Sequence, residues 1–138
     1  MTKNIYENYQ ETEVLNADPL KLVCVLYRAA MEATAAARRH LQAGQIRERS
    51  RRINKAWAII HELRRALSHE QGGEISSRLS ALYAYMQGRL IEANVRQADA
   101  PLAEVEVLLA TLAEAWSAIG VPRSALPEQV YEPVCCAC

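Results

Sequence analysis

The stretch Gly72–Asn94, GGEISSRLSALYAYMQGRLIEAN, joins a pair of glycines to a long amphipathic pattern. Glycine is unfavourable inside helices because its backbone is so flexible, so the pair predicts a break. Beyond the pair, apolar side chains recur at steps of three and four, which predicts the buried face of a helix. This stripe consists of Ile75, Leu79, Leu82, Tyr83, Met86, Leu90 and Ala93. Tyr85 and Ile91 lie off the stripe, which indicates a helix that sits deep in a bundle or offers apolar surface to a partner.

The composition describes one helical domain. The chain has 138 residues, a length that suits a single domain with a real core. Hydrophobic residues make up 51% of it and clusters of strand-favouring residues are sparse, so the expected fold class is all-α. Sixteen basic and sixteen acidic side chains give a formal net charge of zero. This balance removes the broad attraction to phosphate that nucleic-acid binders use, so we expect no nucleic-acid partner.

Nothing in the sequence suggests export or membrane insertion. The first residues, MTKNIYENYQETEV, lack the apolar core of a signal peptide, and the most apolar region after them is interrupted by Lys21, Arg28 and Glu32. Cys24 stands alone, and the other three cysteines crowd into the last four residues, where they cannot staple distant elements. This pattern favours a reducing, cytosolic setting. The three terminal cysteines are Cys135, Cys136 and Cys138.

Turn signals mark the first two helices. Asp18 can accept orphan backbone N–H groups and Pro19 fixes φ at a first helical position, so the first helix is expected to begin there. Gly44 is placed to end it as a left-handed cap. A second amphipathic pattern then runs to Gly72-Gly73. The apolar stripes of these helices are Leu22, Leu26, Ala30, Ala33, Ala37 and Leu41, and then Ile53, Ala56, Trp57, Ile60, Leu63 and Leu67.

A fourth helix is expected between the start signals Asp99 and Pro101 and the stop signals Gly120 and Pro122. Its apolar residues alternate at steps of three and four like a coiled-coil seam. They are Leu102, Val105, Leu109, Leu112, Trp116 and Ile119. Four helices joined by short turns favour antiparallel neighbours, so we expect an up-down-up-down four-helix bundle. The expected regions are an aromatic N-terminal arm or cap over residues 1–17, the bundle over 18–120 and a loose, flexible tail over 121–138.

The sequence shows no machinery for catalysis or for metal binding. A di-iron site in a bundle needs Glu-x-x-His on two helices, but alanine stands three positions before each of the three histidines. The pair His61-Glu62 lacks a second histidine at zinc-protease spacing, because Arg65 occupies that position. Neither a Gly-x-Ser-x-Gly elbow nor a glycine-rich phosphate loop occurs. We therefore expect no enzyme, no cofactor and no metal.

A run of arginines opens the second helix. Glu48 interrupts the run, and the far face of the same helix is apolar. These features favour a solvated helix face over an anion-binding patch. The arginines are Arg47, Arg49, Arg51 and Arg52.

Several short motifs occur in a fixed order between residues 5 and 119. They are Ile5-Tyr6-Glu7-Asn8-Tyr9-Gln10; Ala17-Asp18-Pro19 with Leu22, Leu26 and Tyr27; Ile59-Ile60 with Glu62-Leu63; Gly72-Gly73-Glu74-Ile75; Leu82-Tyr83-Ala84-Tyr85-Met86; Arg89-Leu90 with Glu92-Ala93-Asn94; and Ala103-Glu104-Val105-Glu106 before Ala115-Trp116. Together they resemble the flagellin-specific secretion chaperone family known as FliS. The chain departs from the family pattern at Arg28 and Ala29, where an acidic or amide residue and then glycine are frequent, and at Trp57, where a smaller polar residue is usual.

The resemblance implies a cytosolic, ATP-independent export chaperone that catalyses no reaction. Such a protein binds the disordered C-terminal segment of flagellin, prevents premature polymerisation and supports delivery to a component of the flagellar type III export gate. The flagellin-binding residues that the resemblance implies are Tyr6, Tyr9, Leu22, Tyr27, Tyr83 and Asn94. Because Leu22 and Tyr83 also lie on predicted core stripes, packing of the bundle is the alternative role for them. For Asn94 the alternative is a cap or a bridge between helices.

The aromatic arm suggests a plug. Tyr6 and Tyr9 would cover the apolar groove of the free chaperone and shift when flagellin enters, whereas a static cap that completes the core is the alternative. For the whole protein, a bundle that binds a small ligand is one alternative, and a self-associating helical adaptor without flagellin cargo is the other. It would bury its spare apolar surface in a homodimer through the seam of the fourth helix. The expected state of the chaperone is a monomer or a weak homodimer.

Overall fold

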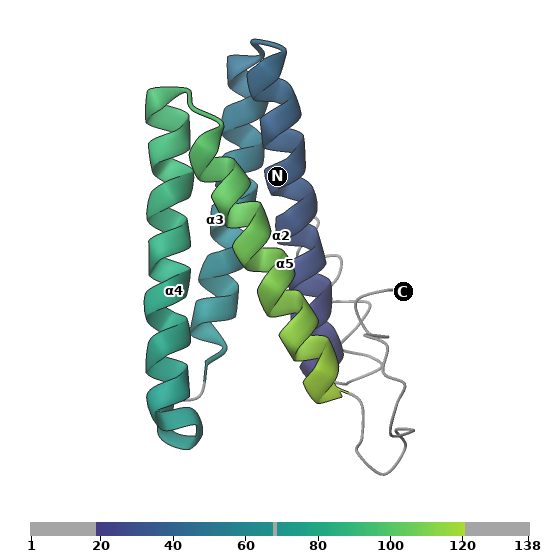
Figure 1. The fold of residues 1–138 in the computed structure, drawn as a ribbon, viewed down its shortest axis with the longest axis vertical. Coiled ribbons are helices and arrows are strands. Elements are labelled where there is room, and N and C mark those ends of the chain that lie inside the picture. Colours follow the sequence, from purple (N-terminus) through teal and green to yellow (C-terminus); the bar gives the residue numbers. More distant parts are fainter. Residues whose placement is uncertain (1–18, 68, 121–138) are drawn as a thin grey trace, which may run out of the picture.

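The computed structural model describes residues 19–67 and 69–120, which form four helices and no strand. These helices are α2 (Pro19–Gln42), α3 (Ile46–Arg65), α4 (His69–Arg96) and α5 (Ala100–Gly120). Each helix packs against its neighbour in the sequence, and α5 returns to α2, so the four close into a ring. They alternate in direction, and α5 crosses the others obliquely (Figure 1). The predicted all-α, up-down-up-down bundle is confirmed, while the arm and tail expected on either side lie outside the described residues.

The first helix begins and ends where the sequence predicts. α2 starts at Pro19, and the backbone turns left-handed at Gly44, whose φ is 73°. The Gly44 N–H donates to the Leu41 carbonyl at 3.1 Å, and the Gln45 N–H donates to the His40 carbonyl at 2.9 Å. These two bonds satisfy carbonyls that the end of a helix leaves open, in the pattern that glycine favours because it has no Cβ. The prediction of a left-handed cap at Gly44 is confirmed.

The glycine pair at 72–73 breaks a helix but does not end α3. Gly73 has φ 55° and ψ −124°, so α4 is kinked near its start. α3 stops earlier, at Arg65, and the Ala66 N–H closes its last turn on the Glu62 carbonyl at 3.0 Å. The predicted extent of the second helix is therefore wrong. After Leu67 the chain continues with polar residues that cannot extend a buried stripe, so packing gives no support to a longer α3.

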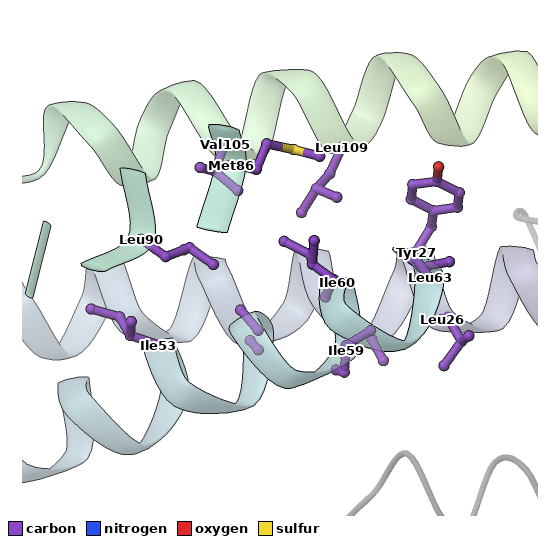
Figure 2. Packing of buried hydrophobic residues seen from close by; sticks show 14 of the residues in the cluster. Leu26, Tyr27, Ile53, Ile59, Ile60, Leu63, Met86, Leu90, Val105 and Leu109 are labelled. Carbon is purple, nitrogen blue, oxygen red and sulfur yellow. The ribbon is translucent and has the colours of Figure 1, made fainter. Parts of the chain in front are cut away.

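The apolar stripes of all four helices meet in one core (Figure 2). Its largest fully buried side chains include Ile60 from α3, Met86 and Leu90 from α4, and Leu109 from α5. The N-terminal half of the α5 seam is buried inside the bundle, whereas Ile119 at its other end is exposed. The residues of the seam that are fully buried are Leu102, Val105 and Leu109.

Two residues assigned to the stripes lie outside the core. Ile75 is 70% exposed and Ile119 is 63% exposed, so both core predictions are wrong. Ile75 comes two residues after the kink at Gly73, and there the buried position falls on the next residue, Ser76, instead. Ile119 belongs to the last turn of α5, at the end of the bundle.

Cys24 differs from the isolated thiol that its position in the sequence suggests. The side chain is fully buried in α2 and the sulfur is disulfide-bonded. The three cysteines predicted to crowd together near the C-terminus lie outside the described residues. Among the helices that the structure describes, none combines the length and the hydropathy needed to cross a bilayer.

Candidate functional site

Two of the predicted binding residues, Tyr27 of α2 and Tyr83 of α4, meet inside the bundle. Their rings lie 6.5 Å apart between centroids at an angle of 49°, and their hydroxyl groups are hydrogen-bonded to each other. The indole Nε1–H of Trp116, on α5, donates to the Tyr27 hydroxyl at 2.9 Å. Three helices are therefore joined at one phenol oxygen. Tyr27 is 0% exposed and Tyr83 1% exposed, so a ligand reaches either ring only if the bundle opens around it.

The environment of this pair favours the neutral form of the Tyr83 phenol. Burial raises the pKa of the Tyr83 hydroxyl above its ordinary value near 10, and the hydrogen bond with Tyr27, followed by the nearby indole N–H of Trp116, offsets part of that rise. A phenol in this state is a hydrogen-bond donor and acceptor rather than a base or a nucleophile. The cluster therefore fixes the relative positions of α2, α4 and α5. The role of Trp116 in it was not predicted, although a buried Tyr or Trp regularly needs a polar partner.

Asn94 bridges α3 and α4 toward the opposite end of the molecule. Its Oδ1 accepts hydrogen bonds from Arg49 Nε at 3.0 Å and from Ser50 Oγ at 3.1 Å. A second guanidinium nitrogen of Arg49 donates to the Asn94 carbonyl at 3.3 Å. Arg49 is only 4% exposed, so the prediction that the arginine run forms a solvated face is wrong for this residue. It is correct for Arg47 and Arg51, which are exposed.

The predicted site residues do not form one continuous site. Leu22 lies in the first turn of α2 and is partly buried against the core, whereas Asn94 lies near the end of α4. Figure 1 shows these two helix ends at opposite ends of the bundle. Tyr6 and Tyr9 lie outside the described residues. Contact between flagellin and any of these six predicted residues stays a prediction.

Apolar side chains also face outward, mainly from α4 and α5. Tyr85 and Ile91 are 48% and 52% exposed, so the prediction that α4 carries apolar residues beyond its core stripe is confirmed. The exposed large apolar residues of these two helices are Ile75, Tyr85, Ile91, Val95, Val107 and Ile119. They provide surface on which an apolar partner segment can lie.

A polar cluster holds α4 to α5 next to this surface. The Tyr85 hydroxyl donates to Glu104 Oε2 at 2.8 Å, and Arg89 Nε donates to Glu104 Oε1 at 2.7 Å. Arg89 also pairs with Glu92 on its own helix at 2.7 Å. The hydrogen bond from Tyr85, and next the one from Arg89, lower the pKa of the Glu104 carboxyl group. Within the described part of the chain, no group of three acidic, histidine or cysteine side chains is placed to bind a metal ion.

Comparison with known proteins assigns the chain to a family. Residues 2–123 match the family described as Flagellar protein FliS. The chain belongs to the FliS family. It is 39% identical over 119 residues to the flagellar secretion chaperone FliS of Salmonella typhimurium, an alignment that covers 86% of this chain and 87% of that protein.

Two further FliS relatives span most of the chain. The flagellar secretion chaperone FliSB of Pseudomonas aeruginosa is 39% identical over 109 residues, which are 79% of this chain and 86% of that protein. FliS of Bacillus subtilis is 31% identical over 114 residues, which are 83% and 84% of the two chains. The family resemblance inferred from the short motifs is confirmed.

The two departures from the FliS pattern have different surroundings. The indole ring of Trp57 stacks on the imidazole of His61 one turn later in α3, with centroids 5.3 Å apart and planes 12° from parallel. The backbone carbonyl of Trp57 accepts a hydrogen bond from the side-chain amide of Gln87, on α4, at 3.3 Å. The guanidinium Nε of Arg28 is buried and has no hydrogen-bond partner among the described residues.

Proposed function

We propose that this member of the FliS family is a cytosolic export chaperone for flagellin. It binds the disordered C-terminal segment of flagellin, prevents premature polymerisation and supports delivery to the flagellar type III export apparatus. The observation that carries the proposal is the family match over residues 2–123. The relatives named flagellar secretion chaperones align along most of their length, which supports a shared role.

The exposed apolar side chains suit this role physically. A disordered amphipathic segment can fold as it binds and lay its apolar anchors along a helical surface. Tyr85 and Ile91 on α4 and Val107 on α5 offer such a surface without disturbing the core. A segment held there would be unable to pair with other flagellin subunits, and the cost of ordering it would keep the complex reversible.

The implied binding residues have three different roles in this proposal. Tyr6 and Tyr9 act as a plug over the binding surface, and Leu22 contacts the cargo directly at the start of α2. Tyr27, Tyr83 and Asn94 position the helices that carry the surface, because their polar groups are bonded between helices. The role requires no catalysis.

The proposed cytosolic location rests on the chaperone role. The disulfide bond of Cys24 argues against it, because disulfides are typical of oxidising compartments. Reductants of the cytosol keep most thiols reduced. Alkylation of free thiols at the moment of cell lysis, followed by mass spectrometry, counts the thiols present in the cell. A reduced Cys24 supports the cytosolic location, and an oxidised one contradicts it.

Calorimetric titration tests the flagellin assignment. The protein is titrated with full-length flagellin and with flagellin that lacks its C-terminal segment. We expect binding only to the full-length form, with the negative heat-capacity change that accompanies apolar burial. Binding to both forms would place the contact elsewhere on flagellin, and binding to neither would contradict the chaperone assignment.

A pair of variants then locates the surface. Ile91→Glu puts a charge on the exposed face of α4, whereas Ala58→Glu puts the same charge on an exposed position of α3. Neither side chain is buried, so both variants are expected to fold. Affinity for flagellin should fall in Ile91→Glu and stay near the wild-type value in Ala58→Glu. Equal affinities in the two variants would remove α4 from the binding surface.

A further inference from the structure

The outer side of the α2–α3 pair carries a groove of about 290 Å³. Three alanines of α2 contribute to its apolar lining, Ala29, Ala33 and Ala36, and each is at most 6% exposed. Small side chains at these positions let α2 and α3 pack closely, which leaves a shallow apolar surface between the longer side chains. The groove lies between α2 and α3 and begins at Ala29, about 10 Å along α2 from the cargo contact proposed for Leu22. The exposed apolar residues assigned to flagellin belong to α4 and α5.

The polar lining of the groove is mostly basic. Arg39 of α2 with Arg52 and Lys55 of α3 line it beside a single acidic residue, Glu32, so the lining has a net charge of two positive units. None of the three basic side chains forms an ion pair within the described residues. Burial, and then the nearby charge of Arg52, lower the pKa of the Lys55 ammonium group. A carboxylate placed in the groove would relieve this repulsion.

We propose that this groove is a docking site for an acidic segment of a protein partner, separate from the flagellin surface. Carboxylates of the segment pair with Arg39, Arg52 and Lys55, and its apolar atoms cover the alanines. Glu32 and Arg39 are seven residues apart on α2, which corresponds to about 10 Å along the helix. An extended segment of about three or four residues spans that length.

The chemistry of the lining favours a peptide over other anions. All seven lining residues lie within α2 or α3 rather than at a helix N-terminus, so no free backbone N–H groups are offered to a phosphate. The zero net charge of the chain gives no broad field for nucleic acid or an anionic membrane. A volume of about 290 Å³ accommodates a few side chains and is at the lower limit for a cofactor-sized ligand.

Fluorescence anisotropy with a labelled eight-residue peptide of alternating glutamate and alanine tests the proposal, and the same peptide with glutamine in place of glutamate is the uncharged control. The double variant Arg39→Glu, Arg52→Glu reverses two charges of the groove. The double variant Arg47→Glu, Arg51→Glu reverses two exposed charges outside it. We expect the first variant to bind the acidic peptide at least about tenfold more weakly and the second to stay within about twofold of wild type.

Three further readouts complete the test. Circular dichroism checks that both variants are folded, and calorimetry checks that both bind flagellin as the wild type does, which separates this site from the proposed function. The glutamine peptide is expected not to bind. Equal binding of the acidic peptide by all three proteins, or its displacement by millimolar inorganic phosphate, would overturn the proposal. Failure of the wild type to bind the acidic peptide would overturn the proposal as well. Such a failure together with capture of the wild type by anionic lipid vesicles would point to a membrane surface instead of a protein segment.

Discussion

The hydroxyl of Tyr27 accepts a hydrogen bond from Trp116 and shares another with Tyr83, so its removal should weaken contacts among three helices. Tyr27→Phe keeps the ring and leaves the buried Tyr83 hydroxyl and the partly buried Trp116 indole N–H without this partner. We expect a loss of about 1–3 kcal/mol in the free energy of unfolding, measured by urea denaturation. Tyr85→Phe, which removes an exposed hydroxyl, should lose less. A loss in Tyr27→Phe no larger than that of the control would mean that the cluster adds nothing to stability.

Asn94 provides the second test at the level of one side chain. Its Oδ1 atom holds Arg49, a cation that is 4% exposed, so Asn94→Ala leaves a buried charge with fewer acceptors. We expect a loss of about 2 kcal/mol in unfolding free energy, because hydrogen bonds to charged groups are among the stronger ones. Asn54→Ala is the control, since Asn54 is exposed on α3. Weaker flagellin binding at unchanged stability would instead identify Asn94 as a direct contact.

The residue that follows α4 has an unfavourable backbone conformation for a side chain other than glycine. Gln97 follows the helix with φ 54°, and the Ala98 N–H donates to the Ala93 carbonyl at 3.1 Å, so glutamine occupies the left-handed position that glycine prefers. Gln97→Gly should raise the unfolding free energy by about 0.5–1 kcal/mol, although added chain entropy in the unfolded state opposes the gain. Gln42→Gly, within the last turn of α2, should lower it by a similar amount. Destabilisation by both variants would show that the backbone at Gln97 is not strained.

The link between α4 and α5 should make stability depend on pH. The pKa of Glu104 lies below its ordinary value near 4.5, because Tyr85 and Arg89 donate hydrogen bonds to the carboxylate. Such a group contributes its full stabilisation above the unfolded pKa and loses it as the pH falls through the lower folded pKa. The difference in melting temperature between wild type and Glu104→Gln should therefore be largest at neutral pH and shrink below about pH 4.5. Glu114→Gln, at an exposed position of the same helix, should show no such trend.

Most helix ends were predictable from local signals, although the end of α3 and the start of α4 were not, and the surroundings of individual side chains were not predictable either. Pro19 and Gly44 mark the ends of α2 because their backbone preferences act without tertiary contacts. The burial of Arg49 and the exposure of Ile75 and Ile119 depend on which helix lies opposite, and a periodic stripe carries no such information. The same limit applies to the candidate site. The motifs named Tyr27, Tyr83 and Asn94, but the hydrogen bonds that give them their roles join helices far apart in the sequence.

At the scale of the whole molecule, the four described helices close a complete ring around a core to which all of them contribute. Residues 1–10 of the arm lie outside these described helices, and their deletion separates the plug from the cap. If the arm is a plug, its deletion should leave the melting temperature unchanged and raise the affinity for flagellin. The gain equals the reciprocal of the fraction of time that the surface is uncovered in the full chain. Thermal melting and calorimetric titration of the same preparation measure both quantities.

The control for this deletion keeps the chain length and changes only the aromatic rings. The double variant Tyr6→Ser, Tyr9→Ser should reproduce the gain in affinity, because a plug acts through the apolar surface that these rings cover. A fall in melting temperature in the deleted chain would instead identify a static cap that completes the core. If both the melting temperature and the affinity stay at the wild-type values, the arm has neither role. If deletion of residues 1–10 raises the affinity for flagellin and the double variant does not, the backbone or other side chains of the arm cover the binding surface.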